Sequence, residues 1–122
     1  DHFKGINDTH GHATGDVVLR GVADAIKDRL RNIDQVFRFG GEEFLIVLTN
    51  TGRESAALVG ERLRNAALQL TYPVNGRPVE LTVSLGCSTL LPGESPDSLL
   101  RRADTALYAA KRQGRNRLEM AG

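Results

Sequence analysis

The chain has 122 residues and a mass of 13.3 kDa, the size of one domain, and its 40% apolar and 25% charged residues are typical of a globular protein. Its 16 basic and 15 acidic side chains give a net charge of +1, which argues against a protein that coats nucleic acid. The single cysteine excludes an internal disulfide, and no apolar run reaches the roughly 20 residues of a membrane helix, so we expect a reducing, aqueous compartment, most simply the cytoplasm.

The first predicted element is an amphipathic helix over residues 15–33. Apolar residues recur there at spacings of three and four and fall on one face: Leu19, Val22, Ile26, Leu30 and Ile33. Two β-type runs follow, at 36–39 and 44–48, and the continuous apolar character of the second is typical of a strand buried on both faces. The Gly-Gly pair at 40–41 predicts that the two runs form a hairpin, because glycine tolerates the positive φ of a tight turn.

A second helix is predicted over residues 54–69, with Leu58 among its apolar positions. The pair at 75–76, Asn-Gly, is a strong signal for a two-residue turn. It would join a short strand at 71–74 to a longer strand at 79–89, where apolar and polar residues alternate.

The third predicted helix has clear signals at both ends. Ser95 is a good N-cap, Pro96 suits the first helical position, and the helix would run to Gln113 with Gly114 as its stop. Residues 117–120 would form a last edge strand. The alternation of helices with strands and hairpins predicts an α+β fold, with a central and mainly antiparallel sheet flanked by helices.

The segment Gly40-Gly41-Glu42-Glu43 is the sharpest candidate for chemistry. Two adjacent carboxylates at a hairpin tip repel each other, and a bound divalent cation would relieve that repulsion. The glycines would let a ligand approach the backbone closely. The alternative is an ordinary solvated hairpin, in which the glycines serve the turn and the glutamates serve solubility.

Two further polar segments stand at the ends of the chain. In the first sixteen residues, side chains such as Asn7 and Asp16 offer the donors and acceptors that can pair with a purine edge, although a polar loop that caps the following helix is an equal alternative. Near the C-terminus, Lys111 and Arg115 are four residues apart and could hold a polyphosphate. The alternative for this pair is a solvated helix face with favourable charge at its C-terminal end.

Four segments together resemble the GGDEF family of diguanylate cyclases. They are DHFKGINDTHGHATGD, RNID followed by RFGGEEF, TVSLG, and RADTALYAAKRQGRN, and they occur in the family's order and spacing over nearly the whole chain. Glu at the third position of the family's namesake motif is a common active variant. The resemblance implies a fold related to nucleotide cyclases and polymerase palm domains, with a ferredoxin-like core.

The resemblance also implies a reaction, in which two GTP molecules condense into cyclic di-GMP and release two pyrophosphates. Each domain would bind one GTP, so a homodimer of catalytic domains is needed, with Mg²⁺ or Mn²⁺ as the metal. A regulatory domain upstream is common in the family, and the parent protein can be membrane-tethered. No nucleic-acid polymer and no organic cofactor are implied.

Roles can be carried over residue by residue. Glu42 matches the metal-binding and catalytic carboxylate, Glu43 is needed beside it, and Lys4 matches a cation that stabilises the transition state. The positions matched to substrate are Asn7 and Asp16 for guanine, His12 for a further contact, the backbone amides near His2 and Phe3 for phosphate, and Lys111 and Arg115 for the triphosphate. The family's second metal-binding Asp falls two residues before Asp1, so we expect a piece of a longer polypeptide that lacks its first strand.

Arg31 and Asp34 match the family's RxxD motif, which binds the product and inhibits the enzyme, and Arg62 matches a secondary contributor to that site. By themselves such residues are more often a surface ion pair. Two competing interpretations of the whole chain remain: a catalytically inactive module that binds GTP or cyclic di-GMP, and a purely structural interaction domain. The substitution Glu42→Gln separates all three: it should abolish turnover in the enzyme, leave product binding intact in the binding module, and change nothing in the structural domain.

Overall fold

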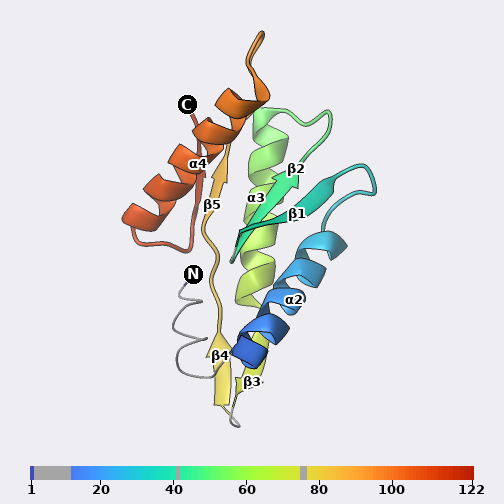
Figure 1. Cartoon of the computed structure of the whole chain (residues 1–122), viewed down its shortest axis with the longest axis vertical. Coiled ribbons are helices and arrows are strands. Elements are labelled where there is room, and N and C mark those ends of the chain that lie inside the picture. Colours follow the sequence, from blue (N-terminus) through green and yellow to red (C-terminus); the bar gives the residue numbers. More distant parts are fainter. Residues whose placement is uncertain (2–11, 41, 75–76) are drawn as a thin grey trace.

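The computed structural model describes residues 1, 12–40, 42–74 and 77–122, with the side chains of 12–16 and 71–80 outside that description. The described helices are α2 (His12–Asp28), α3 (Arg53–Leu68) and α4 (Pro96–Arg112) (Figure 1). The strands are β1 (Gln35–Gly40), β2 (Glu43–Val47), β3 (Thr71–Val74), β4 (Arg77–Glu80), β5 (Leu85–Cys87) and β6 (Leu118–Met120). The α+β class is therefore confirmed. None of the helices in these ranges is both long and apolar enough to cross a membrane.

Helix α2 begins three residues earlier and ends five residues earlier than the apolar periodicity predicts. Leu19 and Val22 do enter the core, but Ile33 is 56% exposed. The helix ends before Ile33 because the chain forms a turn between Arg31 and Asp34. The Asp34 carboxylate accepts the Arg31 backbone N–H at 2.9 Å, and the Asp34 N–H donates to the Arg31 carbonyl at 3.0 Å.

The predicted hairpin is present as the antiparallel pair β1–β2, with Arg38 opposite Phe44 and Gly40 opposite Glu43. The Gly-Gly turn itself includes Gly41, which lies outside the described residues. Strand β2 is half-buried rather than buried on both faces: Phe44 packs against the α2 core, whereas Val47 is 42% exposed. The expectation of a strand buried on both faces is therefore wrong, because β2 is only partly buried along its length.

The predicted strand at 79–89 is divided into two strands with different partners. Strand β4 pairs antiparallel with β3, and Val74 and Arg77 face each other on either side of the Asn-Gly pair, which itself lies outside the described residues. Strand β5 pairs in parallel with β6. The described strands therefore form three two-stranded sheets instead of one central sheet, because none of them pairs with both β2 and β5.

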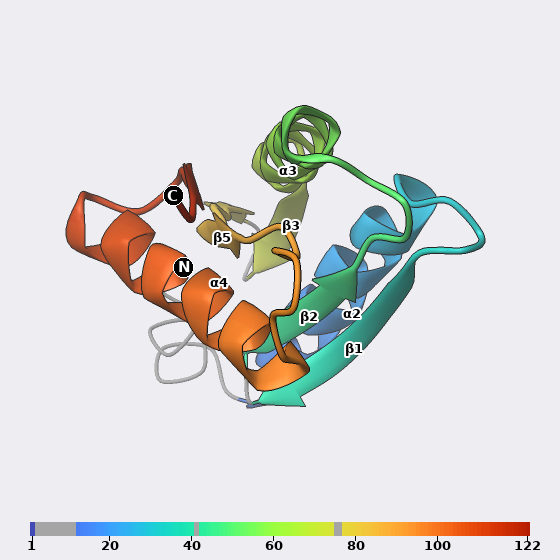
Figure 2. The ribbon, with the colours of Figure 1, turned by 90° about the horizontal axis from the view of Figure 1, so that it is seen from above.

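Helix α3 matches its prediction in extent, although Leu58 lies on its exposed face, 62% accessible. Its buried side is made of small and branched residues: Ala56, Gly60, Leu63, Ala66 and Ala67. Strand β5 lies between α3 and α4 (Figure 2). Both helices therefore cover this strand, one on each side.

Helix α4 confirms both of its predicted end signals. The Ser95 hydroxyl accepts the Ser98 backbone N–H at 3.2 Å, Pro96 takes the first position, and Gly114 follows the helix with φ +117°. The helix lies directly on β5 at Gly86, where an added Cβ would come within 2.2 Å of the Ala103 carbonyl oxygen. The absence of a side chain at Gly86 therefore lets the α4 backbone lie this close to β5.

Candidate active site

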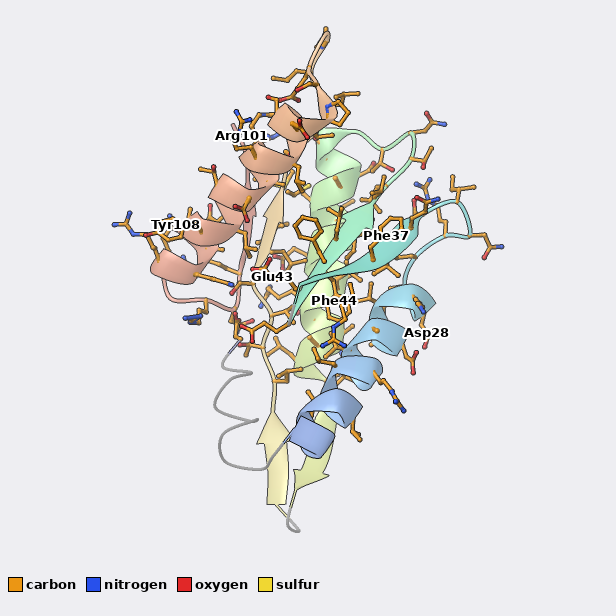
Figure 3. All side chains as sticks on the ribbon, viewed as in Figure 1. Asp28, Phe37, Glu43, Phe44, Arg101 and Tyr108 are labelled. Carbon is orange, nitrogen blue, oxygen red and sulfur yellow. The ribbon has the colours of Figure 1, made fainter. Side chains whose placement is uncertain are left out.

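The turn of the β1–β2 hairpin and the end of α4 meet through an ion pair. Lys111 Nζ lies 3.9 Å from Glu43 Oε1, and their side chains are 34% and 43% exposed. Figure 3 shows Glu43 on the side of the hairpin that faces α4. Glu42 stands immediately before β2 and is exposed. The structure thus brings a predicted carboxylate, with a second one next to it in the chain, close to a predicted cation.

Arg115 lies in the loop that follows α4, and this loop has an unusual backbone. Three consecutive residues have positive φ: Gly114 at +117°, Arg115 at +64° and Asn116 at +46°. A non-glycine residue in this left-handed region costs roughly 1 kcal/mol or more. The Arg115 N–H donates to the Ala110 carbonyl at 3.0 Å, which ties the loop to the last turn of the helix.

Asp1 lies next to both the hairpin turn and this loop. Its carboxylate accepts hydrogen bonds from the Thr82 hydroxyl at 2.9 Å and the Ser84 hydroxyl at 2.8 Å. Glu42, Lys111 and Arg115 all lie close enough to the Asp1 nitrogen to act on it electrostatically, so these three predicted site residues are brought together.

Arg31 and Asp34 form a separate cluster between the end of α2 and the start of α3. The Arg31 guanidinium holds the Asp34 carboxylate through Nε at 3.0 Å and Nη2 at 2.9 Å, and Nη2 also donates to the Thr49 carbonyl and the Thr51 hydroxyl. The hydrogen bond from Arg31 lowers the pKa of Asp34 from its usual 3.8 to about 2. Arg62, the predicted secondary contributor, is exposed on α3. It lies about 13 Å along the helix axis from Arg53, the first residue of that helix.

The predicted site residues of the N-terminal segment have no described side chains. His2, Phe3, Lys4 and Asn7 lie outside the described residues. His12 and Asp16 are placed on the first turns of α2, without described side chains. Their roles stay predictions.

A family model described as "Diguanylate cyclase, GGDEF domain" matches residues 1–117 of this chain. The chain belongs to the GGDEF family. Diguanylate cyclase A of Treponema denticola is 44% identical over 122 residues, which cover 99% of this chain and 33% of that protein. The chain thus spans about a third of the length of this relative.

Solved GGDEF domains have the same fold. The GGDEF domain of DgcB from Caulobacter crescentus, in complex with c-di-GMP, superimposes with a TM-score of 0.95 at 40% identity, over 99% of this chain and 72% of that one. The active GGEEF domain of a diguanylate cyclase from Vibrio cholerae gives a TM-score of 0.91 at 36% identity, over 100% of this chain and 78% of that one. The predicted α+β architecture and the family assignment are therefore confirmed.

The hairpin carboxylates of this GGDEF domain fit a hard divalent cation in their chemistry. Mg²⁺ is commonly bound through one or two carboxylates together with substrate phosphates. Glu42 and Glu43 supply such oxygens beside the cations Lys111 and Arg115. Among the residues that the structure describes, no three His, Cys, Asp or Glu side chains gather into a metal-binding group, so a cation here needs ligands from outside this set.

Several polar residues at the site have no role in the sequence-based prediction. Thr82 and Ser84 hold Asp1, and Arg64 donates to the Asn116 side chain at 3.1 Å. The TVSLG segment contains a usable signal, since hydroxyls two residues apart in an extended segment lie on one side of the chain. The position of Arg64 shows no such signal, because its partner is 52 residues away.

Proposed function

We propose that this GGDEF domain is a catalytic diguanylate cyclase domain that condenses two GTP molecules into cyclic di-GMP and releases two pyrophosphates. The observation that carries this proposal is that the carboxylates of the β1–β2 hairpin lie close to the cations at and after the end of α4. Lys111 lies 3.9 Å from Glu43, and Glu42 and Arg115 both act electrostatically on the nearby Asp1 nitrogen. A triphosphate needs cations along its length, and its reacting end needs a carboxylate that can accept a proton.

In this proposal the cations bind the substrate and orient it. Lys111 and Arg115 hold the β- and γ-phosphates, with the backbone amides near His2 and Phe3 as further donors. Asn7 and Asp16 hydrogen-bond the guanine, and His12 adds a further substrate contact. These assignments follow the family motif.

The chemistry is an in-line displacement at phosphorus. Glu42 accepts the proton of a GTP 3′-hydroxyl, and the freed oxygen attacks the α-phosphate of the GTP on a second domain. A new P–O bond forms, the bond to the β-phosphate breaks, and pyrophosphate leaves. A second displacement closes the ring: the 3′-hydroxyl of the other GTP attacks the α-phosphate of the first, and the second pyrophosphate leaves. Lys4 stabilises the charge that develops on the α-phosphate, and Glu43 keeps Lys111 close to the reacting end.

A divalent metal, Mg²⁺ or Mn²⁺, would be held by Glu42 together with the carboxylate that the family motif places before Asp1. Bound there, it would lower the pKa of the 3′-hydroxyl and neutralise the triphosphate. Because each domain binds one GTP, turnover needs two copies of this domain face to face. A regulatory domain elsewhere in the parent protein would then control the pairing.

Product inhibition is the second part of the proposal. The Arg31 side chain is 54% exposed, and the Asp34 side chain is only 3% exposed. Asp34 occupies Nε and Nη2 of Arg31 and so holds the exposed guanidinium in one orientation, in which the rest of the planar group can meet the guanine edges or phosphates of cyclic di-GMP. Arg62 would be a secondary contributor to this site.

Mass spectrometry of the product tests the proposal. The full-length protein is incubated with GTP and Mg²⁺ at concentrations that allow domains to pair, beside the variants Glu42→Gln and Glu42→Asp. We expect cyclic di-GMP from the unchanged protein, none from Glu42→Gln, and measurable product from Glu42→Asp, because aspartate keeps the carboxylate. No product from the unchanged protein, together with cyclic di-GMP binding, would favour the inactive binding module instead.

A further inference from the structure

The loop that carries Arg115 is held from outside by two residues of distant elements. The Asn116 backbone N–H donates to Asp1 Oδ2 at 3.2 Å, and the Asn116 side-chain oxygen accepts from Arg64 Nη1 at 3.1 Å. Arg64 is in turn fixed on α3 by an ion pair with Glu61 at 2.9 Å. Asn116 is therefore anchored through both its backbone and its side chain.

Arg115 itself is held through its own backbone on both sides. Its N–H donates to the Ala110 carbonyl at 3.0 Å, and its carbonyl accepts from Arg117 Nε at 3.3 Å. Two adjacent non-glycine residues with left-handed backbone are costly, so without these hydrogen bonds the loop would relax to other conformations. The anchors keep the base of the Arg115 side chain in one place.

Asp1 joins this loop to the segment that carries Thr82 and Ser84. Its carboxylate accepts from Thr82 and Ser84 as well as from Asn116, and its backbone nitrogen donates to the Thr82 carbonyl at 2.9 Å. One carboxylate thus holds the loop of Arg115 against the segment that carries Thr82 and Ser84.

We propose that Asp1 and Asn116 are positioning residues for the triphosphate: their hydrogen bond holds the loop that carries Arg115 in place. This inference rests on the proposed function, because it takes Arg115 as a phosphate ligand. The family motif assigns neither residue to the substrate. Their loss should therefore weaken the hold on the β- and γ-phosphates while the recognition of guanine is retained.

Calorimetric binding of GTP and of GMP in the full-length protein tests this role, with Glu42→Gln as the background so that no turnover occurs. GMP keeps the guanine but lacks the two outer phosphates. We expect Asp1→Ala to raise the Kd of GTP roughly tenfold or more, the loss typical of a hydrogen bond to a charged group, and to change the Kd of GMP less than about twofold. Asp1→Asn should recover part of the loss, because its amide oxygen can still accept the Asn116 N–H.

Two further variants keep the outcome decisive. Asn116→Gly permits the left-handed backbone and removes only the anchor to Arg64, so it should fold and show a smaller loss confined to GTP. Ser84→Ala removes one contact to Asp1 but leaves the Asp1–Asn116 hydrogen bond, and should bind both nucleotides normally.

Arg115→Ala separates the inference from the proposed function. If Arg115→Ala loses GTP selectively while Asp1→Ala and Asn116→Gly do not, the positioning role is wrong and the phosphate role of Arg115 stands. Equal weakening of GTP and GMP by Asp1→Ala would show a merely structural role and also overturn the inference. If Arg115→Ala itself binds GTP normally, the phosphate assignment in the proposed function fails.

Discussion

Arg31 and Asp34 form a two-point ion pair in which Nε and Nη2 of the arginine lie 3.0 and 2.9 Å from the two carboxylate oxygens. The same carboxylate accepts the Arg31 backbone N–H at 2.9 Å and the Thr49 N–H at 3.4 Å. Asp34 therefore has a structural role that does not depend on any ligand: it ends the turn after α2 and connects it to the segment before α3. The predicted inhibition motif is built on this structural turn.

The stability of the domain should depend on the ionisation of Asp34. Its pKa falls from 3.8 to about 2, because the hydrogen bond from Arg31 favours the charged form. A lowered pKa means that the stabilisation is fully present above about pH 4 to 5 and is lost as the pH falls through 2. Thermal unfolding of the unchanged protein and of Asp34→Asn should show a gap in Tm near neutral pH that narrows below pH 4. A gap that is constant with pH would contradict this assignment.

Arg31 should be required for product inhibition. We expect Arg31→Ala to raise the inhibitory concentration of cyclic di-GMP roughly tenfold or more, since a charge-assisted hydrogen bond is lost. Arg31→Lys keeps the charge but not the planar fork, so it should recover only a small part. The measurement is the initial rate of pyrophosphate release against added cyclic di-GMP, normalised to each variant's own uninhibited rate. Unchanged inhibition in Arg31→Ala would exclude this site.

The sequence predicts best those features whose signals are local. The start and end of α4 are marked by Ser95, Pro96 and Gly114, and the structure places all three as predicted. The hairpin is equally local, because a Gly-Gly pair lies between two β-type runs. Capping and turn chemistry act within a few residues, so one sequence is enough to read them.

Features that depend on distant partners are predicted less well. The apolar periodicity of α2 continues to Ile33, but the Arg31–Asp34 turn ends the helix first. The alternating run at 79–89 looks like one strand, yet its two halves pair with β3 and β6 respectively. At the site, the meeting of Lys111 with Glu43 and the anchoring of Asn116 by Asp1 follow from the fold and have no local signal.

Lys111 should contribute more to substrate binding than its neighbour Arg112. Lys111 faces Glu43 at 3.9 Å, whereas the Arg112 guanidinium lies over the ring of Tyr108, 5.7 Å from its centroid, and Tyr108 is 63% exposed on the outer face of α4 (Figure 3). We expect Lys111→Ala to raise the KM for GTP about tenfold through the lost phosphate contact. Arg112→Ala removes the same charge from the adjacent position and should change KM less than about twofold. Equal effects would indicate a general loss of positive charge rather than a specific contact.

Gly86 should be irreplaceable for stability, because its position sets how closely α4 approaches β5. An added Cβ would lie 2.2 Å from both the Ala103 carbonyl oxygen and the Leu107 backbone nitrogen, and neither backbone atom can move without the helix. Overpacking of this kind costs about 3 kcal/mol, so Gly86→Ala should lower the midpoint of urea unfolding markedly. It should also weaken GTP binding, since a displaced α4 carries Lys111 away from Glu43.

Gly60→Ala is the matched control for this substitution. Its Cβ would also come close to another residue, at 2.9 Å, but the neighbour is the tip of the Leu118 side chain, which can rotate away. Alanine inside α3 also gains up to about 1 kcal/mol in helix propensity, so the net change in unfolding free energy should be small. Similar losses in the two variants would mean that the contact between α4 and β5 is not the tighter one. A large loss of unfolding free energy and of GTP binding in Gly86→Ala alone would show that the contact between Gly86 and the α4 backbone holds Lys111 in position.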